Sequence, residues 1–114
     1  MIKNIYALKP NMVPNCHDGE GTVSVVDVFD KFSTKMQFLH YTVLPPGSSI
    51  GSHKHADDEE FYVVLEGSGE MELDGANQTV SAGDVIMNKP HGTHGLRNVS
   101  ETDELKLLVF EVKI

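Results

Sequence analysis

The chain has 114 residues, which is enough for one domain with its own apolar core. Its formal net charge is −8 and its nine Lys and Arg residues are scattered, which argues against a nucleic-acid partner and against an anionic membrane surface. The single cysteine, Cys16, excludes an intrachain disulfide and a multi-thiolate zinc site. No stretch approaches the roughly 20 apolar residues of a membrane span. We therefore expect a soluble, cytoplasmic, single-domain protein whose acidity serves ordinary solubility.

Residues 1–21 are expected to form an irregular N-terminal arm that belongs to the same domain as the rest of the chain. This segment contains Pro10 and Pro14 and shows no sustained hydrophobic period. A short edge strand is expected around Ile5 and Tyr6. Arms of this kind in small barrels often pack on a neighbouring subunit, so the arm also suggests self-association.

Residues 22–114 alternate short β-prone stretches with turn signals, and no segment has a convincing helical period. Asp74-Gly75 is a strong hairpin signal because both central positions of the favoured turn need positive φ. Strands are expected at residues 22–29, 37–44, 60–66, 70–73, 78–81, 85–88, 94–99 and 104–112, with a further strand before residue 55. Roughly eight or more short strands separated by turns predict an all-β sandwich or barrel, of which a double-sheet jelly roll is one form.

Residues 47–69 hold the most specific pattern in the chain. His53 and His55 are two residues apart on an expected strand, so their imidazoles point to the same face. The short polar segment 56–59 suits a turn that brings Glu60 back beside them. Imidazole and carboxylate together suit iron, manganese, nickel, cobalt or zinc, so this stretch predicts a site for one divalent metal ion.

The spacing of these residues resembles the first conserved motif of the cupin superfamily. That motif consists of a glycine, five residues, His-x-His, four residues, a glutamate, six residues and a second glycine. The matching positions in this chain are Gly47, His53, His55, Glu60 and Gly67.

A second stretch, residues 83–98, is similar to the second cupin motif. Its matching positions are Gly83, Pro90, Gly92, His94 and Asn98. The Pro-x-Gly element sits one residue late, but the span from Gly83 to His94 is preserved. The resemblance implies that His94 is the fourth metal ligand and that the fold is a double-stranded β-helix, or jelly-roll barrel, of two antiparallel sheets over residues 22–114. It also implies a homodimer, because small single-domain cupins commonly pair.

Two candidate ligands have rivals in the sequence. Glu59 competes with Glu60, and strand parity and the motif spacing both favour Glu60. His91 competes with His94, but residues three apart on an extended chain point to opposite faces, so only one of them is expected to bind. We prefer His94 and place His91 in the turn at the mouth of the cavity. The alternative for the whole set is a charged surface loop with no metal.

Other polar residues are weaker candidates. His40 shares a strand face with Phe38, and it is either a hydrogen-bonded core histidine or a group that orients a substrate or a metal ligand. Tyr62 follows Glu60 by two positions and could line the cavity. His17 has no nameable partner and is expected to be a solvated loop residue, and Cys16 is expected to be inert.

Two functions of different class agree with this pattern. The first is a metal-dependent enzyme that acts on a small polar molecule, since oxygenase, isomerase, decarboxylase and lyase activities occur among the proteins that this chain resembles. The second is a small-ligand binding or sensing barrel with a structural metal, because no second carboxylate, lysine or tyrosine has an assured place in the cavity to act as general base. We favour the enzyme, since four protein ligands leave coordination positions open on a metal that prefers octahedral geometry.

Overall fold

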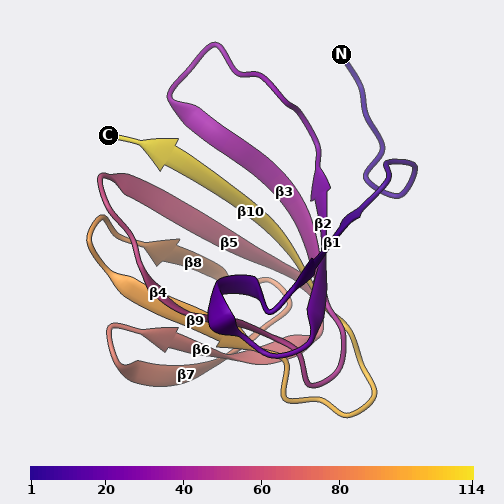
Figure 1. Ribbon diagram of the computed structural model, residues 1–114, viewed down its shortest axis with the longest axis vertical. Coiled ribbons are helices and arrows are strands. Elements are labelled where there is room, and N and C mark those ends of the chain that lie inside the picture. Colours follow the sequence, from indigo (N-terminus) through magenta and orange to yellow (C-terminus); the bar gives the residue numbers. More distant parts are fainter.

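The computed structural model describes all residues from 1 to 114 and contains two antiparallel β-sheets that face each other (Figure 1). The larger sheet has the order β1 (Asn11–Pro14), β2 (Thr22–Asp27), β3 (Met36–Leu44), β10 (Leu105–Lys113), β5 (Asp58–Glu66) and β8 (Val85–Asn88). The smaller sheet has the order β4 (Ser49–Lys54), β9 (Thr93–Arg97), β6 (Ser68–Leu73) and β7 (Ala76–Ser81). The only helical element is the short 3-10 turn η1 (Cys16–Asp18). The chain contains no helical segment that could serve as a membrane span.

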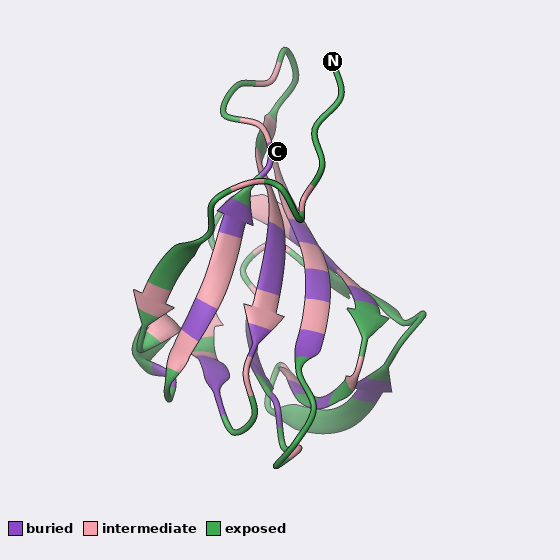
Figure 2. Cartoon of the chain, turned by 90° about the vertical axis from the view of Figure 1, so that its right-hand side faces the viewer, coloured by how far each residue is buried: buried purple, intermediate pink, exposed green.

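This architecture confirms the expected all-β jelly roll of two antiparallel sheets. The hydrophobic core lies between the sheets, and buried residues alternate with more exposed ones along the strands of the larger sheet (Figure 2). On β10 the buried positions are Leu105, Leu107 and Val109, which share one face because side chains two apart on a strand point the same way. On β5, Glu60 is buried on the same face as Tyr62, so the core side of this strand carries a carboxylate into the interior.

The N-terminal arm differs from the expectation at one point. The prediction of a strand around Ile5 and Tyr6 is wrong. These residues form a turn in which the Ala7 amide donates to the Asn4 carbonyl at 3.0 Å. The N-terminal strand is instead β1, which pairs with β2 from Asn11 opposite Val25 onwards. Pro14 is tolerated there because β1 lies at the edge of the sheet, where a missing amide donor leaves no neighbour unpaired.

Residues 15–21, which we call the strap, connect β1 to β2 and lie against β4 (Figure 1). The Ser49 amide donates to the Glu20 carbonyl at 2.9 Å, and the Glu20 amide donates to the Ser49 hydroxyl at 2.9 Å. The two backbones touch at Gly51, where an added Cβ would overlap the carbonyl oxygen of His17. Glycine at position 51 therefore allows the strap to sit on the strand that carries His53.

Asn98, the last residue of the second motif, has a structural task. Its buried amide nitrogen donates to the carbonyls of Leu44 at 2.9 Å and Asp103 at 2.8 Å, and its side-chain oxygen accepts from the Ser100 amide at 3.0 Å. These bonds tie the chain after β9 to the end of β3 and to the next loop. The motif asparagine therefore supports the barrel end without belonging to the histidine cluster.

Replacement of Gly51 by Ala is expected to destabilise the fold by about 1–3 kcal/mol, because the new methyl group forces two packed backbones apart. Lys54→Ala on the same strand removes an exposed side chain and is the control, with an expected change within about 0.5 kcal/mol. Urea unfolding of both variants measures the difference. Equal stability of Gly51→Ala and the unchanged protein would contradict the close contact between the strap and β4.

Candidate metal centre

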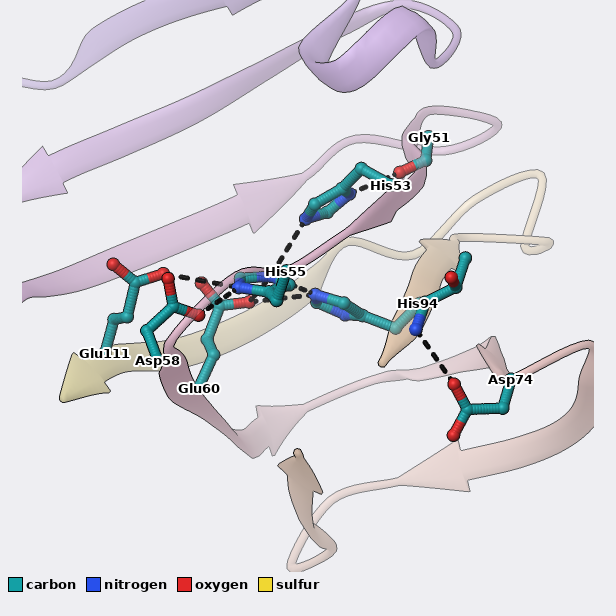
Figure 3. Close-up of polar contacts among 9 residues, drawn as sticks. Gly51, His53, His55, Asp58, Glu60, Asp74, His94 and Glu111 are labelled. Atoms are coloured by element: carbon teal, nitrogen blue, oxygen red, sulfur yellow. Dashed lines mark hydrogen bonds and ion pairs between the residues drawn. The ribbon is translucent and has the colours of Figure 1, made fainter. Parts of the chain in front are cut away.

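Four side chains from three strands and one turn meet inside the barrel (Figure 3). His53 lies on β4 and His55 just after it, Glu60 lies on β5, and His94 lies on β9 directly opposite His53 in the strand register. One nitrogen or oxygen atom from each residue lies within 4.8 Å of the others. His94 and Glu60 are buried, and the two other histidines are half-buried. The fold thus gathers all four residues that the sequence singled out.

The atoms that converge are the three Nε2 nitrogens and one carboxylate oxygen. The Nε2 atom of His55 lies 2.6 Å from that of His94 and 3.2 Å from that of His53. The Oε1 atom of Glu60 lies 3.2 Å from the His94 Nε2 and 3.5 Å from the His55 Nε2. A single point between them is within reach of all four.

The hydrogen bonds on the far side of two rings determine which nitrogens carry protons. The Nδ1 of His53 lies 2.8 Å from the Gly51 carbonyl, which can only accept, so this nitrogen holds the proton. Burial lowers the pKa of His53 to about 4, so its ring is neutral near pH 7 and its Nε2 presents a lone pair. The Nδ1 of His55 likewise donates to the Asp58 carboxylate, at 2.6 Å. Both rings are therefore oriented as metal-ligating histidines are, with Nε2 free.

A divalent metal fits this arrangement. Lone pairs that face one another repel unless a proton or a cation lies between them. The Oε1 of Glu60 is buried and has no hydrogen-bond partner, which is costly for a carboxylate oxygen in the interior. Three imidazole nitrogens and one carboxylate oxygen are also a common ligand set for borderline divalent metals.

Asp58 and Glu111 surround the outer nitrogen of His55, and sequence reasoning did not identify either of them. The Glu111 Oε1 lies 3.5 Å from His55 Nδ1, and burial, followed by the charges of Asp58 and Glu60, raises the pKa of Glu111. Strand parity contained a signal for Glu111, since it continues the inward series of Leu105, Leu107 and Val109. Asp58 and Glu111 together fix the orientation of the His55 ring.

Glu59 and His91, the alternative candidates for the ligand positions, lie outside the cluster. The cluster contains Glu60 and not Glu59. His91 lies on an exposed turn, where its Nε2 is 2.9 Å from the Asp57 carboxylate. Arg97 is exposed and lies 3.4 Å from Glu20, so it points away from the cluster, as parity predicts.

The strap brings two residues to the site that the sequence did not place there. The His17 ring stacks on the His53 ring, with 3.6 Å between centroids and 9° between planes. His17 is exposed, as expected of a loop residue, and the stacked His53 ring is a partner that the sequence did not identify. Cys16, half-buried beside it, lines the same cavity. No local sequence pattern predicts that His17 and Cys16 lie at the site, because their positions depend on the contact between the strap and Gly51.

A cavity of about 260 Å³ opens beside the cluster, with His53 and Glu60 in its wall. Its apolar wall consists of Val13, Val23, Val25, Phe38, Ile50 and Val109. His40 and Tyr62 also line it, so the face that carries His40 is the inner one. Burial lowers the pKa of His40 and raises that of Tyr62 well above its usual range, the nearby Glu60 adding to the latter shift.

The cupin-domain profile matches residues 40–111, which is more than half of the chain. The chain belongs to the cupin family. An oxalate-binding protein of Thermotoga maritima is 30% identical to this cupin over 105 residues, which cover 90% of this chain and 87% of the relative. A crystal structure described as that of a predicted oxalate decarboxylase from Thermotoga maritima has a TM-score of 0.96 at 28% identity, over 100% of both chains. A protein of Thermus thermophilus shares the fold, with a TM-score of 0.76 at 23% identity over 98% of this chain and 96% of its own.

Asp58→Asn is expected to weaken divalent-metal binding by roughly 10–100-fold, because the His55 ring loses the charged partner that holds its Nδ1 proton. Asp57→Asn is the matched control, since Asp57 is exposed and pairs with His91 instead. Isothermal titration of the chelator-treated proteins with Zn²⁺ and Mn²⁺ measures the metal affinity of both variants. Similar losses in the two variants would show that the Asp58–His55 contact does not support metal binding.

Proposed function

We propose that His53, His55, Glu60 and His94 hold one divalent metal ion, and that the protein is a metal-dependent enzyme acting on a small polar molecule. The observation that carries this proposal is the convergence of three Nε2 atoms and a buried carboxylate oxygen at the wall of a cavity. The metal would be iron, manganese, nickel, cobalt or zinc. When bound, it supplies Lewis acidity or, if redox-active, access to dioxygen chemistry. The reaction would be of the oxygenase, isomerase, decarboxylase or lyase type.

The residues that line the cavity can bind a substrate and move a proton. Tyr62 keeps its hydroxyl proton because burial raises its pKa, so it can donate a hydrogen bond to a substrate oxygen. His40 is kept neutral by burial, which leaves one ring nitrogen able to accept a proton and the other able to donate one. We propose these two residues as the catalytic candidates.

The name of the Thermotoga maritima sequence relative and the description of the Thermotoga maritima crystal structure both refer to oxalate, a small ligand rich in carboxylate oxygens. By analogy, we propose that the ligand of this protein also presents a carboxylate beside the metal ligands. Within the enzyme types above, this analogy supports a carboxylic acid substrate.

The alternative function is a small-ligand binding or sensing barrel with a structural metal and no catalysis. The observation that favours it is the composition of the cavity wall, in which Glu60 is the sole carboxylate and no lysine occurs. If Glu60 and His53 bind the metal, His40 and His17 are the two imidazoles that remain in the wall, which is a small set of groups for acid–base chemistry.

Elemental analysis followed by an activity screen tests the proposal. We expect about one metal ion per chain, and metal-dependent turnover within a panel of oxo-acids, sugars and catechols. His55→Ala should abolish both, and His91→Ala should change neither, since His91 lies outside the cluster. Tight, metal-independent ligand binding with no turnover would favour the sensing barrel. Protein that neither contains metal nor takes it up would refute the four-ligand site.

We also propose that the partner in assembly is a second copy of the chain. The arm supports this, because Met1, Ile2 and Tyr6 expose 100%, 98% and 78% of their surfaces, and large apolar side chains gain free energy when a partner covers them. A reducing compartment such as the cytoplasm suits the single free cysteine, and this location stays a prediction.

Deletion of residues 1–10 should shift the protein from dimer to monomer, because it removes this exposed apolar segment and leaves β1 intact. Size-exclusion chromatography with light scattering measures the mass. Replacement of Lys9 by Ala within the intact arm is the control and should leave a dimer. A dimer that survives the deletion would show that the arm is not the interface.

A further inference from the structure

The cavity beside the metal ligands contains no lysine and no arginine among its 13 lining residues. Arg97 is on the strand of His94 but points outward toward Glu20. The nearest charges are negative instead, since Glu60 lines the cavity and Asp58 and Glu111 lie behind His55. An anion in this cavity therefore finds no side-chain cation to neutralise it.

This composition limits the charge of a ligand that the site can bind. The inference rests on the proposed metal function. Counted over the four candidate ligands alone, a divalent cation with one carboxylate and three neutral imidazoles leaves one net positive charge, and the carboxylates behind His55 make the surroundings more negative still. A monoanion would make the site neutral, whereas a dianion would leave an uncompensated negative charge in a half-enclosed, largely apolar space. Uncompensated buried charge is costly. A compact dianion such as oxalate is therefore a poor match for this cavity.

The shape and surface of the cavity point to a ligand with an apolar body. Eight of the 13 lining residues are hydrophobic, and the aromatic ring of Phe38 is stacked on that of His40 with 4.2 Å between centroids. A volume of about 260 Å³ exceeds what a ligand of oxalate's size needs and suits a branched or phenyl-substituted acid. Thr42 and Tyr62 carry hydroxyl groups that can donate to a second ligand oxygen.

We propose that this cavity binds a 2-oxo or 2-hydroxy monocarboxylic acid with a branched or aromatic side chain, and that Phe38 determines this preference. The carboxylate and its neighbouring oxygen face His53 and Glu60. The apolar side chain packs against Phe38 and the valines of β1 and β2. This specificity distinguishes the chain from a site built for oxalate.

The test is calorimetric binding of four acids to the full chain loaded with a redox-inert metal such as Zn²⁺, after its metal content has been measured. Phenylpyruvate and 4-methyl-2-oxopentanoate are expected to bind at least about tenfold more tightly than pyruvate, because they bury several additional carbon atoms. Their affinity should also be about tenfold or more higher than that of oxalate. Binding is read directly, so the result does not depend on turnover.

Phe38→Ala should reduce the preference for phenylpyruvate over pyruvate by about tenfold and leave pyruvate binding unchanged. Phe38→Leu keeps an apolar surface and should retain most of the preference for phenylpyruvate. It provides a second variant in case Phe38→Ala does not fold. Phe61→Ala is the matched control, because Phe61 packs on Phe110 and does not line the cavity.

The possible failures are distinguishable. Protein that does not take up metal refutes the proposed metal function. Metal-loaded protein that binds oxalate or pyruvate as tightly as the larger acids, or that binds none of the four, overturns the inference about the ligand alone. An equal effect of Phe38→Ala and Phe61→Ala removes Phe38 as the determinant.

Discussion

The candidate metal centre depends on a cluster of electron pairs that has too few donors to satisfy it, since three Nε2 nitrogens and a buried carboxylate oxygen converge there. His53 and His55 each commit their Nδ1 proton to an oxygen outside the cluster, which turns their Nε2 lone pairs toward His94 and Glu60. Desolvation keeps the His53 ring neutral near pH 7, so its Nε2 carries no proton into the cluster. A bound cation removes this cost, and the two sheets keep the four groups converged because each group stands on a different element of the barrel.

The space next to the cluster is shaped by a segment far from the motifs. The strap carries Cys16 and His17 over the barrel, and it is held by backbone contact at Gly51 and by the hydrogen bonds to Ser49. The same contact stacks His17 on a candidate ligand. As a result, the N-terminal arm is part of the cavity wall, and the properties of the cavity are set jointly by the arm and by the larger sheet.

The charge and polarity of the cavity narrow the choice of ligand more than the candidate metal ligands do. The same three histidines and one glutamate are compatible with many reactions, because a metal's chemistry depends on the ion and on what lies beside it. Here the neighbours are valines, an isoleucine, a phenylalanine, two hydroxyl groups and the two histidines His17 and His40, which are not candidate metal ligands. This is the physical reason why similarity to proteins named for oxalate and the composition of this cavity lead to different expectations for the ligand.

The sequence by itself determined the β-class of the fold, the parity of each strand and the convergence of His53, His55, Glu60 and His94. The β-class, the strand parity and the proximity of His53, His55 and Glu60 follow from local rules, since the period of a strand is two and a short turn brings the chain back beside itself. His94 was added by the resemblance of residues 83–98 to the second cupin motif. Sequence reasoning failed for the strand expected at Ile5 and Tyr6, and it found no role for His17 or Asp58. Only the tertiary structure decided these, together with which strand face is internal, because docking of the arm on β4 and pairing of β10 with β5 join residues that no local pattern connects.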